Sequence, residues 1–138
     1  MLTFRFFEER RVNMRKFLLA AGAIALIGAS PVLAAGEMSV ATFLAKADAL
    51  KAKGFGALGS PDIKLLRTEA EAAGATYRSR MEADKKAGRP PHSCPPDKTK
   101  MTSDQFMTHL RSYPATARPK TSVTTAVFDL MKKRYPCP

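Results

Sequence analysis

Apolar residues recur along most of this chain at the three- and four-residue spacing of amphipathic helices, and the pattern predicts four helices. The first begins after Ser39, a good capping residue, and ends near Lys53, where Gly54 stops it. Residues 55–59 follow as a flexible, glycine-rich connector. One face of this helix would carry its apolar residues, Val40, Phe43, Leu44, Ala47 and Leu50.

The second predicted helix is longer and begins at Ser60-Pro61-Asp62, which supplies a cap, a first-turn proline and a first-turn acid. We expect it to end before Gly88. Its polar second half, residues 78–86, is expected to stand in solvent. The buried side of its first half would carry Ile63, Leu66, Ala70, Ala73 and Tyr77.

Residues 89–96 cannot be helical, because their four prolines fix φ and remove backbone donors. A capping box of Thr102 and Gln105 then predicts a third helix that stops at Pro114. After a basic linker, Thr121 is expected to cap the last helix. The apolar faces would carry Phe106, Met107, Leu110 and Tyr113 in the third helix, and Val123, Ala126, Val127, Leu130 and Met131 in the last.

The fold class follows from these four patterns together. No stretch of the chain has the period-two alternation of a strand, and no internal repeat is visible. At 138 residues the chain is long enough for one domain and too short for two. We therefore expect an all-α fold, a small four-helix domain.

The first 34 residues have the order of a secretory signal peptide. A basic start, residues 14–16, precedes an apolar run over residues 17–27, and small residues then favour cleavage between Ala34 and Ala35. Because residues 1–13, which include Glu8 and Glu9, fit this scheme poorly, we take Met14 as the true start. The alternative is a membrane anchor, which needs about 20 uninterrupted apolar residues, whereas Pro31 breaks this run.

Cleavage would leave residues 35–138 as a single helical domain in the periplasm, with no stable membrane insertion. The formal net charge of +11 comes from 23 basic and 12 acidic residues, and 18 and 10 of these lie after residue 34. Such a basic surface could bind an acidic partner, a phospholipid surface or nucleic acid, or it could simply be solvated. Export and the lack of aromatic residues among the basic ones argue against nucleic acid.

Export also predicts the state of the two cysteines. Cys94 and Cys137 would meet an oxidising compartment, where a lone pair normally forms a structural disulfide. In the chain-entropy model, a bridge that closes a loop of about 44 residues stabilises the fold by about 4 kcal/mol. The bridge would clamp the last two helices as a C-terminal hairpin.

Motifs for catalysis are missing from the sequence. It contains no nucleotide-binding loop, no Gly-x-Ser-x-Gly elbow and no His-Glu-x-x-His run. His109 lies at the margin of an apolar helix face and is expected to be partly buried, whereas His92 is expected to be exposed. Oxidation of Cys94 and Cys137 would prevent zinc binding or cysteine catalysis with these histidines. We therefore expect no enzyme, no metal site and no cofactor.

The C-terminal half resembles the Rap/Tai family, small periplasmic immunity proteins of type VI secretion systems. The resemblance rests on Cys94-Pro95, a capped helix over residues 102–113, a proline, a further helix, and the ending Tyr135-Pro136-Cys137. It covers residues 93–137. Members commonly carry another cysteine in the first half near a Gly-Tyr-apolar-Gly stretch, and the nearest equivalent here, residues 72–78, has none.

The resemblance implies a helical protein, often a homodimer, that occludes the active site of a peptidoglycan-degrading, amidase-type effector. A rigid projecting loop suits that task, because preorganisation lowers the ordering cost of binding. We nominate residues 89–100 as this loop, with Arg89, His92, Lys98 and Lys100 as candidate contacts. The alternative is a small periplasmic helical protein that binds the envelope or responds to stress and inhibits no effector.

Overall fold

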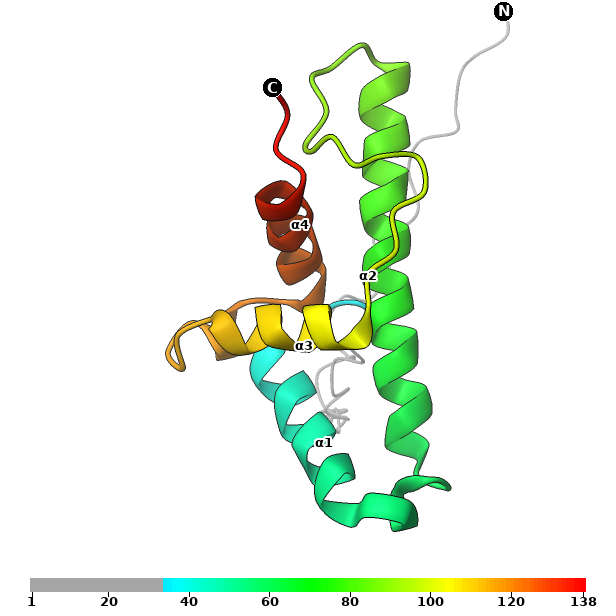
Figure 1. Cartoon of the computed structure of the whole chain (residues 1–138), viewed down its shortest axis with the longest axis vertical. Coiled ribbons are helices and arrows are strands. Elements are labelled where there is room, and N and C mark those ends of the chain that lie inside the picture. The colour runs from blue at the N-terminus through cyan, green and yellow to red at the C-terminus, as the bar shows by residue number, and fades with distance from the viewer. Residues whose placement is uncertain (1–33) are drawn as a thin grey trace, which may run out of the picture. The chain divides into compact units, whose positions relative to one another are not determined.

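A computed structural model describes residues 34–138, so the predicted signal peptide up to residue 33, with its start at Met14, lies outside the described residues. Within residues 34–138 there is no strand, apart from an isolated bridge between Ser39 and Ser122. The predicted all-α, four-helix fold is confirmed (Figure 1). The elements are α1 (Val40–Lys53), η1 (Gly54–Ala57), α2 (Pro61–Lys86), α3 (Ser103–Ser112), η2 (Arg118–Lys120) and α4 (Val123–Arg134), where η denotes a 3₁₀ helix.

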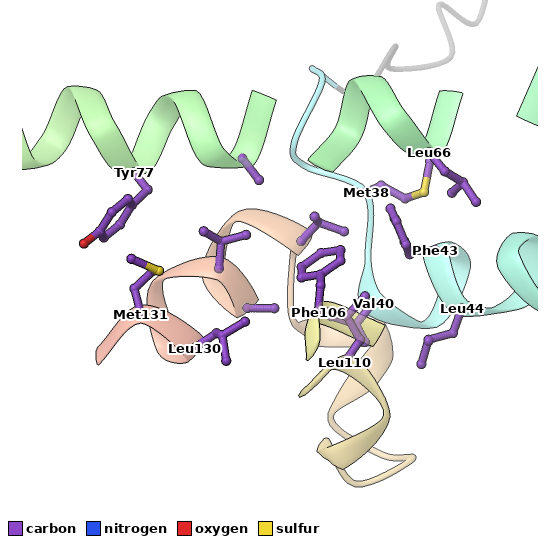
Figure 2. Packing of buried hydrophobic residues seen from close by; sticks show 14 residues of the cluster. Met38, Val40, Phe43, Leu44, Leu66, Tyr77, Phe106, Leu110, Leu130 and Met131 are labelled. Atoms are coloured by element: carbon purple, nitrogen blue, oxygen red, sulfur yellow. The ribbon is translucent and has the colours of Figure 1, made fainter. Parts of the chain in front are cut away.

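The long helix α2 is the element against which both α1 and α4 pack, and α3 runs across the space between α1 and α4 (Figure 1). Leu110 of α3, Val40 of α1 and Val123 of α4 are completely buried where these elements meet. Figure 2 shows Val40 and Leu110 close together, and both belong with Val123 to a single hydrophobic cluster. The cluster also includes Met38, Phe43, Leu44, Leu66, Ala73, Tyr77, Phe106, Ala126, Val127, Leu130 and Met131.

Most helix starts are where the caps in the sequence place them. The Ser39 hydroxyl accepts a hydrogen bond from the Thr42 amide at 3.2 Å. Thr102 and Gln105 form the predicted capping box, with both reciprocal bonds at 3.2 Å. At α2 the start at Pro61 is as predicted, although the Ser60 side chain makes no capping bond.

The predicted cap of the last helix is wrong by one residue. Ser122, rather than Thr121, accepts the capping hydrogen bond from the Thr125 amide at 3.1 Å. The Thr121 hydroxyl instead donates to the Ala117 carbonyl at 3.0 Å, and the Thr121 carbonyl accepts from the Val40 amide at 2.8 Å. Both bonds hold Thr121 in the preceding η2 turn, so the helix starts one residue later.

The chain just after the predicted cleavage point is fixed by a buried carboxylate. Glu69 of α2 is 5% exposed, and its Oε2 accepts hydrogen bonds from the amides of Gly36 at 2.6 Å and Met38 at 3.3 Å. The Thr124 hydroxyl donates to the Gly36 carbonyl at 2.7 Å. Gly36 has φ +93°, and a Cβ there would lie 2.8 Å from the Thr124 hydroxyl oxygen, so the position requires glycine. Ala34 and Ala35, immediately before it, are exposed.

None of the helices within residues 34–138 has both the length and the hydropathy needed to cross a bilayer.

Candidate partner-binding site

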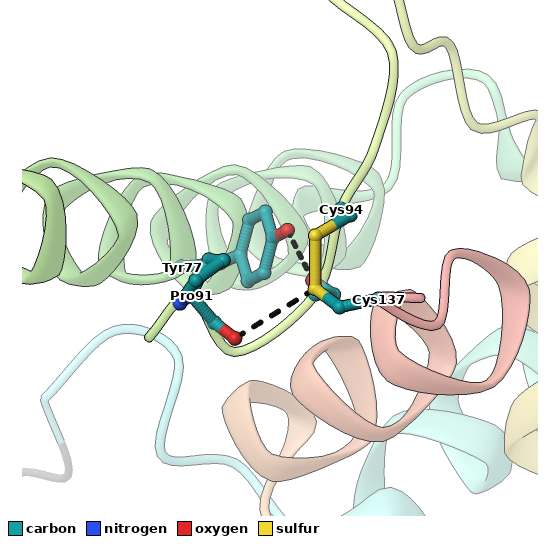
Figure 3. The surroundings of a disulfide bond; sticks show 5 residues. Tyr77, Pro91, Cys94 and Cys137 are labelled. Carbon is teal, nitrogen blue, oxygen red and sulfur yellow. Dashed lines mark hydrogen bonds between the residues drawn. A yellow bond between two sulfur atoms is a disulfide. The ribbon is translucent and has the colours of Figure 1, made fainter. Parts of the chain in front are cut away.

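The predicted disulfide between Cys94 and Cys137 is present, with the two Cα atoms 5.0 Å apart. It joins the proline-rich segment after α2, residues 89–100, to the chain end that follows α4 (Figure 3). The Cys94 amide also donates to the Tyr135 carbonyl at 2.8 Å. The segment is therefore tied to the end of α4 by a covalent bond and a backbone hydrogen bond at one point.

A second attachment holds the same segment to α2. The hydroxyl groups of Tyr77 and Ser93 are 2.6 Å apart and share a hydrogen bond. Ser93 is completely buried and Tyr77 is nearly so. A buried hydroxyl pair is stable only while both partners stay together, because either one alone would be left without a hydrogen bond.

His92 is not exposed, contrary to the prediction. Its ring packs edge to face against Phe128 of α4, with centroids 5.1 Å apart, and against Tyr77 of α2 at 6.4 Å. Its Nδ1 atom is buried and has no hydrogen-bond partner within residues 34–138. The sequence did not show this, because Phe128 lies beside the apolar face predicted for the last helix rather than on it. His92 therefore helps to anchor the segment.

A buried carboxylate holds the start of the segment. Asp84 is 2% exposed, and its two oxygens accept hydrogen bonds from Arg80 Nε and Arg89 Nε, both at 2.8 Å. These bonds, with Arg80 first and Arg89 second, hold the pKa of Asp84 below its ordinary value. The prediction that residues 78–86 all stand in solvent is therefore wrong for Asp84. Arg89, which is half-exposed, is engaged by this carboxylate.

Of the nominated residues, Lys98 and Lys100 are the two that are exposed and form no ion pair within residues 34–138. Between them the Thr99 hydroxyl donates to the Pro96 carbonyl at 2.7 Å, which closes the turn that carries the two lysines. The lysines therefore project from a locally fixed turn.

A groove, which the sequence analysis did not predict, lies between this turn and α2. Its volume is about 490 Å³. The apolar lining includes Phe106 of α3 with Val127 and Met131 of α4, all of them core residues. Polar groups at the groove come from both sides, with Glu71 and Arg78 on α2 and Asp97 and Thr99 on the turn. An apolar recess edged by charged groups can accept a side chain or short peptide from a partner.

His109 is half-buried, as predicted. Its ring packs edge to face against Tyr113, with centroids 5.2 Å apart. Burial lowers the pKa of His109 from its ordinary value. Within residues 34–138, no three histidine, cysteine or acidic side chains are grouped as metal ligands.

Comparison of the chain with protein-family models, curated proteins and solved structures gave no match. The resemblance to the Rap/Tai family stays a prediction from the motif at residues 93–137.

Proposed function

We propose that the protein is an exported immunity-type protein that binds and inhibits a peptidoglycan-degrading, amidase-type effector of type VI secretion. The observation that carries the proposal is a segment fixed to two helices yet exposed at its turn. The disulfide, the Tyr77–Ser93 hydrogen bond and the Asp84 ion pairs hold residues 84–94 in place. A surface fixed before binding loses little conformational entropy on binding, which favours tight inhibition.

The chemistry of the turn and groove suits a protein partner. Lys98 and Lys100 can contact acidic groups at the edge of an interface, where charge steers association and sets specificity. The groove lined by Phe106, Val127 and Met131 can bury an apolar side chain of the effector near the centre of that interface. An inhibitor that works by occlusion needs no catalytic group of its own.

The test begins with capture of a partner by the oxidised protein of residues 35–138, followed by an assay of the captured protein for peptidoglycan hydrolysis. The proposal predicts that a captured amidase is silenced at a one-to-one ratio. Reversing both charges, Lys98→Glu with Lys100→Glu, should weaken inhibition about tenfold or more. The matched control reverses Lys51 and Lys53 at the end of α1 and should leave inhibition unchanged. Capture of no hydrolase, or equal inhibition by both double variants, would contradict the proposal.

The alternative, a periplasmic envelope-binding protein without inhibitory activity, is favoured by the basic surface of residues 35–138. This alternative predicts that the protein is retained on envelope material and that this retention falls steeply with added salt. It also predicts that no protein partner is captured.

A further inference from the structure

The turn between α1 and α2, residues 54–60, exposes two large apolar side chains. Phe55 is 92% exposed and Leu58 is 80% exposed, more than any other large hydrophobic residue in the described part of the chain. Two more apolar residues, Ile63 and Leu65 at the start of α2, are 36% and 38% exposed, so the prediction that Ile63 lies on the buried side is wrong. The glycines of residues 55–59 predicted only a flexible connector here. Exposed Phe and Leu side chains have a free-energy cost in water and mark surfaces that meet a partner.

This α1–α2 tip is a defined turn. The Leu58 amide donates to the Phe55 carbonyl at 3.3 Å, and the Ser60 amide donates to the Ala57 carbonyl at 2.8 Å. Ala57 is buried and anchors the middle of the turn. Phe55 and Leu58 are thus held outward on either side of an anchored residue.

Positive charge borders the tip on both helices. Lys51 and Lys53 occupy the last turn of α1, and Lys64 and Arg67 lie in the first two turns of α2. All four are exposed, and none of them forms a salt bridge within residues 34–138.

The two nearby acids, Asp62 and Asp48, are each paired with a further base, so the border keeps a net positive charge. Asp62 is bonded to Lys46 at 2.8 Å, and Asp48 is paired with Arg111. The Arg111 hydrogen bond holds the pKa of Asp48 below its ordinary value. The tip therefore combines an exposed apolar centre with an uncompensated basic border.

We infer that the α1–α2 tip docks into the interfacial region of an anionic phospholipid bilayer. Phe55 and Leu58 enter the boundary between headgroups and acyl chains, and Lys51, Lys53 and Lys64 contact lipid phosphates. Aromatic and leucine side chains combined with lysine are the composition of interfacial membrane binders. Phe55 and Leu58 alone form too small an apolar patch for the core of a stable protein interface.

This inference is independent of the proposed inhibitor function, because it uses a different surface. The tip lies at the opposite end of α2 from the segment that carries the disulfide (Figure 1). About 24 Å of helix separates Pro61 from Tyr77, where that segment is attached. Docking through the tip would hold the protein at the membrane with Lys98 and Lys100 still accessible.

Vesicle co-sedimentation of the purified, oxidised protein tests the inference. We expect binding to vesicles that mix phosphatidylcholine with phosphatidylglycerol, little binding to pure phosphatidylcholine, and weaker binding as salt is added. The double variant Phe55→Ser with Leu58→Ser should bind the mixed vesicles about tenfold or more weakly. Because both side chains are exposed, this variant should keep the wild-type circular dichroism spectrum and thermal unfolding curve.

Charge variants separate the tip from the general basicity of the protein. Lys51→Glu with Lys53→Glu should weaken vesicle binding, whereas Lys98→Glu with Lys100→Glu, the same charge change elsewhere, should not. Equal vesicle binding by wild type and the Phe55→Ser, Leu58→Ser variant would overturn the inference. So would equal losses from the two charge variants, or a tip variant that alters only self-association in sedimentation velocity.

Discussion

Two buried carboxylates, Glu69 and Asp84, hold together parts of the chain that the helix pattern leaves unconnected. Glu69 binds the amides of Gly36 and Met38, more than thirty residues earlier in the chain. Asp84 binds Arg80 on its own helix and Arg89 on the following segment. Both carboxylates lie on α2, and Asp84 falls in residues 78–86, which were expected to stand in solvent. Buried charges of this kind are retained only where partners satisfy them.

Replacing Glu69 should loosen the start of the folded domain. Glu69→Ala removes the acceptor for two backbone amides and should lower the free energy of unfolding by about 2 kcal/mol, as measured by urea denaturation. Glu71→Ala, an exposed position two residues along the same helix, is the control and should change stability by less than about 0.5 kcal/mol. Equal effects of the two substitutions would show that the Glu69 bonds do not stabilise the fold.

Replacing Asp84 with asparagine should destabilise the protein relative to wild type by an amount that depends on pH. Because Arg80 and Arg89 lower the pKa of Asp84 below its ordinary value of 3.8, the ionised carboxylate stabilises the fold above about pH 4. That contribution is lost as the pH falls through the lowered pKa. Asp84→Asn should therefore unfold more easily than wild type at neutral pH, and the difference should shrink in acid. Glu82→Gln is the exposed control, and an Asp84→Asn deficit that is constant from pH 7 to pH 3 would refute the explanation.

At the scale of elements, the helices could be predicted because their signals are local. The capping residues Ser39 and Thr102 and the proline at position 61 act within one turn, so their helices start where the sequence places them. Helix α4 starts one residue later than predicted because the Thr121 carbonyl accepts a hydrogen bond from the Val40 amide, which is distant in the sequence. The helix pattern contains no information about such long-range bonds.

The disulfide-held segment shows the same limit. The pairing of Cys94 with Cys137 could be predicted, because a chain with just two cysteines and a predicted export signal leaves one choice. The burial of His92 and the presence of the groove beside Lys98 could not be predicted, because both depend on how the segment packs between α2 and α4. The periodicity of apolar residues predicts which residues share a helix face, and it gives no information about an irregular, proline-rich segment.

The disulfide itself should carry much of the stability of this segment. Replacing both cysteines, Cys94→Ser with Cys137→Ser, should lower the free energy of unfolding by about 4 kcal/mol in the chain-entropy model, measured by urea denaturation. Amides near Ser93 should lose protection from hydrogen exchange before those of α1 and α2 do, since the Tyr77–Ser93 bond depends on the tether. A loss below about 1 kcal/mol would mean that the packing of His92 suffices to hold the segment.

At the scale of the whole molecule, the fold separates two surfaces of different character. One is the fixed segment with Lys98, Lys100 and the apolar groove, and the other is the α1–α2 tip with Phe55 and Leu58. The first suits a protein partner because it is preorganised and recessed. The second suits a lipid surface because it is convex, apolar and bordered by lysines. An inhibitor that rests on a membrane while its binding surface stays free would use both.

We propose that the disulfide-held segment is the surface that binds a peptidoglycan-degrading effector. Hydrogen–deuterium exchange of the oxidised protein, alone and bound to the amidase that it captures, tests this proposal. We expect slower exchange of the Lys98, Thr99, Lys100 and Met101 amides in the complex, with no change at residues 54–58. Protection confined to the α1–α2 tip, or absent from residues 98–101, would contradict it.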